Sequence, residues 1–194
     1  MAIYGNGLNW NADDRHCVAE SSNLKSSIVG NIYDLIVRDG SDDPIAVDNG
    51  CAVKVGEYTG DGLQTRYATV ADDDEKIALV LTPAVIKDAF TKQQEQAFNF
   101  YNKAGAVVKA YEVVEEDIFG VSKEFITPIT PSGSTTPTPI AVGDFVTWDP
   151  DTLKYKVVAS DPSATAGFVA KVHSIQVGTF YDLVRLFVIQ NKDI

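Results

Sequence analysis

The feature that most constrains this chain is a series of short apolar runs, each ended by Gly, Asp or Asn. From Ile28 onward apolar residues alternate with polar or small ones over spans too short for a helix. Turn signals such as Asp39-Gly40 and Asp48-Asn49-Gly50 separate the runs. The pattern predicts a mainly β fold, formally α+β, built from antiparallel meander or barrel-like modules. We expect strands within residues 32–37, 45–47, 51–55, 65–70, 77–81, 107–114, 117–122, 145–148, 155–158, 167–172 and 181–190.

One segment favours a helix over a strand. Thr82-Pro83 supplies a capping hydroxyl and a proline suited to the first helical turn, and Gly105 supplies a natural stop. Between them apolar residues recur at spacings compatible with one helical face. We therefore expect one α-helix around residues 86–103.

The chain divides into four segments by composition. Residues 1–27 are rich in Asn, Asp and Ser and sustain no helical or strand period, which predicts an extended N-terminal arm. Residues 28–126 form a β-rich module with the helix. Residues 127–139 hold four of the eight prolines and predict a linker or a long loop. Residues 140–194 then form a small C-terminal β module.

The arm carries isolated apolar anchors that it cannot bury by itself. Tyr4, Leu8 and Trp10 stand among polar residues, so we expect them to pack on the body of the protein or on another subunit. They are our candidate interface residues.

Charge and hydropathy exclude several classes of partner. The chain has 16 Lys and Arg against 27 Asp and Glu, a formal net charge of −11, and no Lys/Arg-rich stretch. A phosphate backbone would be repelled, so we expect no direct nucleic-acid binding. The longest aliphatic run, Ile77–Leu81, is far shorter than the roughly 18 residues that span a bilayer, so no membrane insertion is expected. Two cysteines are too few for a disulfide framework, which is typical of a protein made in a reducing cytoplasm.

The residues that bind metals are few and scattered. His16, Cys17, Cys51 and His173 have no spacing typical of a zinc site, although a site using all four is conceivable. Asp72–Glu75 is a contiguous acidic run that lacks the alternating ligands of a calcium loop, so we interpret it as a solvated turn. We expect no metal and no cofactor.

Catalytic motifs are also lacking. Ser22 and Lys25 match an SxxK pattern, but the companion motifs of serine enzymes of that class do not occur. No GxSxG, GxxxxGK[ST] or GxGxxG sequence occurs either. We therefore expect that the protein is not an enzyme.

Two hypotheses remain for a binding function. In the first, an aromatic-anchored arm and acidic β modules hold on to other proteins. In the second, Trp148, Asp149 and Tyr155 share an exposed face that binds a carbohydrate. The second hypothesis requires both rings to be exposed.

Several strand-like segments resemble structural proteins of tailed bacteriophages, in which an RAYxL strand leads to a GDxFSVS strand. Lys109 replaces the arginine of that pattern, and Glu116 replaces the glycine. The matching segments are Val107–Val113, Glu116–Ser122, Val142–Val146, Phe168–Val172 and Val184–Ile189, within a resemblance that covers roughly residues 28–194.

The resemblance implies a virion protein, most specifically a head decoration or auxiliary protein made in the host cytoplasm. Such a protein stabilises the head shell by binding the outer surface of the major capsid protein, often as a homo-oligomer such as a trimer. The net negative charge suits a surface that faces solvent rather than packaged DNA.

Overall fold

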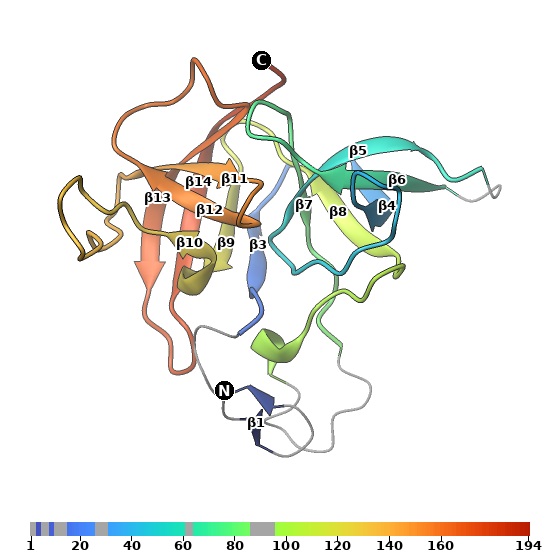
Figure 1. The fold of residues 1–194 in the computed structure, drawn as a ribbon, viewed down its shortest axis with the longest axis horizontal. Coiled ribbons are helices and arrows are strands. Elements are labelled where there is room, and N and C mark those ends of the chain that lie inside the picture. The colour runs from blue at the N-terminus through green and yellow to red at the C-terminus, as the bar shows by residue number, and fades with distance from the viewer. Residues whose placement is uncertain (1–2, 5–7, 10–14, 26–30, 61–63, 86–95) are drawn as a thin grey trace.

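The computed structural model describes residues 3–4, 8–9, 15–25, 31–60, 64–85 and 96–194, and these form a mainly β protein (Figure 1). The strands make a closed five-stranded barrel, a seven-stranded sheet and a two-stranded pair. The predicted fold class, mainly β with a barrel-like module, is confirmed. In the described parts of the chain no helix has the length and apolar content needed to cross a membrane.

The barrel is formed by the first half of the chain. Its strands close in the order β4-β6-β5-β7-β8, and β4 is parallel to β6 while the other described pairs are antiparallel. The pairing of β8 with β4 closes the sheet and removes its free edges. The sequence predicts antiparallel meander or barrel-like modules. The barrel departs from a meander at one point: β4 pairs with β6, in parallel, and not with β5, the next strand in the chain. The bounds are β4 (Ile32–Arg38), β5 (Ala52–Tyr58), β6 (Thr65–Val70), β7 (Ala78–Val80) and β8 (Val108–Glu112).

The seven-stranded sheet draws on three of the predicted segments. Its order is β10-β12-β11-β13-β14-β9-β3, so β3 comes from the predicted arm, and β9 and β10 come mainly from residues 28–126. Only the β10–β12 pair is parallel among the described pairs of this sheet. The bounds are β3 (Ala19–Asn23), β9 (Ile118–Ser122), β10 (Ile126–Thr127), β11 (Phe145–Asp149), β12 (Lys154–Val158), β13 (Phe168–Gln176) and β14 (Leu183–Asn191), with a 3₁₀ helix η3 (Lys123–Phe125) before β10.

The proline-rich segment connects two strands of the same sheet. Residues 128–144 join β10 to β11, and both of these strands pair with β12. The Thr138 N–H donates to the Ile129 carbonyl at 2.9 Å, and the Ile129 side chain packs against the core. The segment is therefore a long surface loop that folds back on itself.

Barrel and sheet share one hydrophobic core. Trp148 and Tyr155 of the sheet are 1% and 0% exposed, and both reach the barrel side. The Trp148 indole Nε1 donates to the Ala71 carbonyl at 2.9 Å, and the Tyr155 hydroxyl donates to the Gly50 carbonyl at 3.0 Å. These buried hydrogen bonds join the two parts because each satisfies a carbonyl that water does not reach.

The predicted α-helix around residues 86–103 is absent from residues 96–103, the part of it that the structure describes. Residues 86–95 lie outside the described residues, and from Gln96 onward the chain forms only the 3₁₀ helix η2 (Ala97–Asn99) before extended backbone at Phe100. Asn102 and Val47 pair in an isolated bridge, with backbone hydrogen bonds of 2.9 and 3.0 Å. This pairing requires extended backbone, so tertiary hydrogen bonds outweigh the local helical preference. The expected strand at 45–47 is correspondingly reduced to a bridge at Val47.

The predicted arm is only partly extended away from the body. β1 (Ile3–Tyr4) pairs antiparallel with β2 (Leu8–Asn9), which places Tyr4 opposite Leu8. Trp10 lies outside the described residues. Farther along, β3 is an integral strand of the large sheet, so the arm as predicted ends well before residue 27.

Candidate functional site

The predicted carbohydrate-binding face does not exist at Trp148 and Tyr155. Both rings are buried and pack edge-to-face, with centroids 5.2 Å apart. Asp149 is half-buried and accepts a hydrogen bond from the Thr152 hydroxyl at 2.8 Å. The prediction of an exposed aromatic face is therefore wrong, because both rings fill the junction between the sheet and the barrel.

The scattered histidines and cysteines do not converge. The His16 Nδ1 lies 2.8 Å from the Asp48 carboxylate, and its ring stacks on Tyr101 at 4.7 Å. His173 is exposed on β13 of the seven-stranded sheet. Over the described ranges no three His, Cys, Asp or Glu side chains come together as a metal site would require. The structure gives no support to a zinc site built from His16, Cys17, Cys51 and His173.

The two thiols and the SxxK serine are held in structural roles. Burial raises the pKa of the Cys51 thiol to about 12 and that of Cys17 still higher, so both are protonated at neutral pH. Ser22 accepts a hydrogen bond from Arg185 Nε at 3.2 Å, while Lys25 pairs with Glu116 at 3.0 Å. Ser22 and Lys25 thus have separate partners and do not form the nucleophile and base of a serine enzyme.

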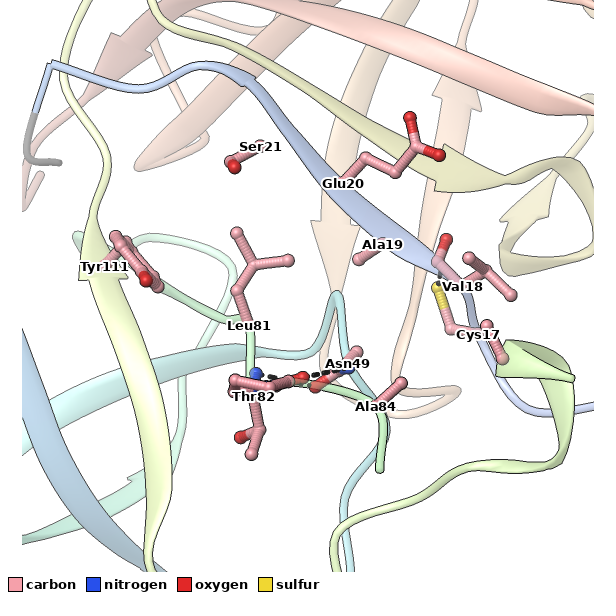
Figure 2. Close-up of a pocket in the computed structure, with 12 residues that line it drawn as sticks. Cys17, Val18, Ala19, Glu20, Ser21, Asn49, Leu81, Thr82, Ala84 and Tyr111 are labelled. Atoms are coloured by element: carbon pink, nitrogen blue, oxygen red, sulfur yellow. Dashed lines mark hydrogen bonds between the residues drawn. The ribbon is translucent and has the colours of Figure 1, made fainter. Parts of the chain in front are cut away.

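A groove of about 460 Å³ lies between the large sheet and the barrel (Figure 2). β3 forms one wall, and the chain that leaves β7 forms the other, with Tyr111 of β8 beside it. In Figure 1 this is the region between β3 and β7. The lining residues are Cys17, Val18, Ala19, Glu20, Ser21, Asn49, Leu81, Thr82, Pro83, Ala84, Ala97 and Tyr111.

Two buried asparagines fix the wall opposite β3. The Asn49 side chain donates to the Thr82 carbonyl at 2.8 Å and accepts from the Thr82 N–H at 3.0 Å. The Asn102 amide donates to the Asn49 side-chain oxygen at 3.2 Å and to the Val47 carbonyl at 3.1 Å. Leu81 continues the line of β7 because its N–H donates to the Lys109 carbonyl at 2.8 Å. The wall is therefore rigid, since a satisfied buried network resists rearrangement.

The β3 wall presents unpaired backbone. β3 is the last strand of its sheet, and no described strand pairs with its outer side. The Ser122 N–H donates to the Val18 carbonyl at 2.8 Å, which identifies Val18 and Ser122 as a hydrogen-bonded pair of the antiparallel ladder. Because such pairs alternate, the N–H and C=O groups of Ala19 and Ser21 point away from β9, towards the groove. The groove thus has the geometry to receive an extended chain as a further strand.

The groove is nearly uncharged. Glu20 is the only Asp, Glu, Lys or Arg among its lining residues, and its side chain is directed away from Leu81 and Thr82 (Figure 2). The remaining lining side chains are apolar or carry an uncharged thiol, hydroxyl or amide group. Such a surface suits recognition of main-chain groups more than recognition of a charged ligand.

Sequence reasoning missed this groove. The β3 sequence AESSN has no apolar alternation, and four of its five residues are exposed, so no period identified it as a strand. Leu81 and Thr82 were expected at the end of a strand and at a helix cap, and neither expectation indicates a groove. A polar edge strand is visible only once its partner β9 is known.

Comparison with known protein families, with curated proteins and with solved structures finds no match for this chain. What the protein does is therefore inferred from its residues and from the geometry of the groove. The candidate interface residues Tyr4 and Leu8 lie on the paired strands β1 and β2. The role of Tyr4, Leu8 and Trp10 in an interface remains a prediction.

Proposed function

We propose that this protein is a non-enzymatic structural protein of a tailed-bacteriophage virion, made in the host cytoplasm, that binds the outer surface of the head shell. Its partner is the major capsid protein. The observation that carries the proposal is the free edge of β3, which faces a rigid and nearly uncharged groove between two firmly joined β units.

The segments that resemble phage structural proteins support the proposal as a group. They coincide with or overlap β8, β9, β11, β13 and β14. Four of these strands are consecutive neighbours in the large sheet, in the order β11-β13-β14-β9, and β9 is the strand that pairs with β3. The similar sequence pattern thus corresponds to the part of the sheet that carries the free edge.

Binding in this proposal occurs by strand addition. An extended segment of the major capsid protein lies along Ala19 and Ser21 and hydrogen-bonds to their outward backbone groups. Tyr4, Leu8 and Trp10 provide a second contact, to the shell or to a neighbouring copy. A homo-oligomer, such as a trimer, repeated around the shell gains avidity from contacts that are individually weak.

The test is co-sedimentation of the protein with heads that lack it, using two variants at one position. Ser21→Pro removes an N–H that faces the groove, while proline is tolerated in an edge strand. Ser21→Ala changes the side chain and keeps the N–H. We expect Ser21→Pro to weaken head binding by at least about tenfold, and Ser21→Ala to bind as the natural chain does. Equal binding by the natural chain and Ser21→Pro, with melting temperatures unchanged, contradicts strand addition at β3.

The arm contact is tested by a separate truncation. The deletion must end before residue 15, because Cys17 and Val18 are buried and residues 19–23 form β3. We expect deletion of residues 1–14 to weaken head binding while the melting temperature stays within a few degrees. If the truncated chain binds heads as well as the full chain does, the assignment of Tyr4, Leu8 and Trp10 as contacts is wrong.

A further inference from the structure

A second pocket, of about 260 Å³, lies at one end of the barrel. At this end β4, β6 and β7 begin and β5 and β8 finish, as their parallel and antiparallel pairings require. We call it the barrel-mouth pocket. It is lined by Tyr33, Lys54, Val55, Arg66, Lys76, Ile77, Ala78, Glu112 and Asp193.

Arg66 is the cation of this pocket that has no acidic partner. Lys54 forms an ion pair with Glu75, and Lys76 forms one with Glu112. Within the part of the chain that the structure describes, no carboxylate lies at ion-pair distance from Arg66. In a chain of net charge −11, an arginine left without a carboxylate at the wall of a pocket is a candidate for binding an external one.

The Arg66 side chain is nevertheless held in position. Its Nε donates to the Gly56 carbonyl at 2.8 Å. The guanidinium carbon lies 4.9 Å from the centre of the Tyr58 ring and 5.7 Å from that of Tyr33. This arrangement uses the Nε–H and the faces of the two rings. Among the described residues it does not engage the two terminal amino groups, which form the fork that binds a carboxylate in a bidentate manner.

The rest of the pocket selects among anions. Glu112 and Asp193 are part of the lining, so a doubly charged phosphate would be repelled more strongly than a singly charged carboxylate. Val55, Ile77 and Ala78 add an apolar wall that can accept the short aliphatic group to which a carboxylate is attached. The volume suits about one residue of a peptide rather than a large ligand.

We infer that the barrel-mouth pocket binds a carboxylate of a peptide, with Arg66 as the hydrogen-bond donor. The carboxylate belongs either to a chain terminus or to an acidic side chain. This inference does not depend on the proposed virion function, because the pocket lies on the barrel and its test uses the isolated protein.

The test is a titration of the full chain with three synthetic probes, followed by NMR or calorimetry. The first probe is acetyl-Ala-Ala-Val with a free terminal carboxylate, the second is its C-terminal amide, and the third is acetyl-Ala-Glu-Ala amide. We expect the first or the third to bind and the second not to bind, and the one that binds identifies the source of the carboxylate. Inorganic phosphate is a fourth probe and should bind more weakly.

Variants then assign the binding to Arg66. We expect Arg66→Gln to weaken binding at least about tenfold, and Arg66→Lys to weaken it too because an ammonium lacks the planar fork. Arg38→Gln is the matched control, since Arg38 also stacks on a tyrosine of the barrel, Tyr67, but does not line the pocket. It should bind as the natural chain does.

Two results overturn the inference. One is that neither carboxylate probe binds the natural chain. The other is that a carboxylate probe binds the natural chain, but either Arg66→Gln binds it with the same affinity or the natural chain binds phosphate more tightly than the probe. If Arg66→Gln fails to fold, the natural chain still decides, because the NMR signals of the Arg66 Nε–H and the Gly56 amide must shift on addition of the probe.

Discussion

Raising the pH from 7 to 10 tests how the junction between barrel and sheet is built, because three weak acids are buried there. Cys17, Cys51 and Tyr155 are 2%, 1% and 0% exposed. Burial raises the pKa of the Cys51 thiol from 9.0 to about 12, and it also raises the pKa values of the Cys17 thiol and the Tyr155 hydroxyl. All three groups therefore keep their protons in the folded protein at pH 10.

The unfolded chain loses those protons earlier, and this sets the magnitude. With unfolded pKa values of 9.0 for a thiol and 10.0 for a tyrosine, each thiol lowers the free energy of unfolding by about 1.4 kcal/mol at pH 10, and the tyrosine by about 0.4 kcal/mol. The sum is about 3 kcal/mol. Because the folded pKa values are raised, this stability is present below pH 9 and is lost as the pH rises through the window from 9 towards 12.

Urea denaturation under reducing conditions, followed by tryptophan fluorescence at pH 7 and pH 10, measures the effect. The comparison is between the natural chain and a variant that carries both Cys17→Ala and Cys51→Ala. Surface groups and Tyr155 titrate in both proteins, so the difference between their pH dependences isolates the two thiols, and we expect it to be about 2.8 kcal/mol. Equal loss of stability in the two proteins between pH 7 and pH 10 refutes the burial of ionisable thiols at the junction.

Two further substitutions test the packing of the same junction, each by thermal or urea unfolding. Tyr155→Phe removes a buried hydroxyl that donates to the Gly50 carbonyl, and we expect it to lower the free energy of unfolding by about 1–3 kcal/mol. The control is Tyr58→Phe, on a side chain that is 63% exposed, which should lower it by less than about 0.5 kcal/mol. Gly167→Ala places a Cβ against the backbone of Asp74 and Glu75 and should cost about 1–3 kcal/mol or more. Gly40→Ala, with open space around it, should be nearly neutral. Equal stability within either pair would show that the junction is less closely packed than described.

Several strands were predictable because their burial follows a period of two. The run at 155–158 became β12 and the run at 181–190 became β14, and buried residues alternate with half-buried ones along most of both strands. The Gly and Asp turns that end the runs mark most strand boundaries to within a few residues. A half-buried strand carries its own signal in its sequence, which is why local reasoning succeeds for it.

Pairing partners were not predictable, because they depend on residues far apart in the chain. Nothing in residues 118–122 indicates that this strand leaves the barrel and joins β14. Likewise Asn102 ends the expected helix through a bridge to Val47, some 55 residues earlier. The groove was not predictable for the same reason, because its walls come from distant parts of the chain. One wall is an edge strand without an apolar pattern, and the other is held by the buried amide of Asn49.

The measurement that tests the proposed function most directly is an electron-microscopy map of phage heads bound to this protein. We predict density for the protein on the outer surface of the shell, with an extended segment of the major capsid protein running along the free edge of β3. Absence of the protein from the head surface would contradict the proposed virion function. A bound protein whose β3 edge faces solvent would contradict strand addition.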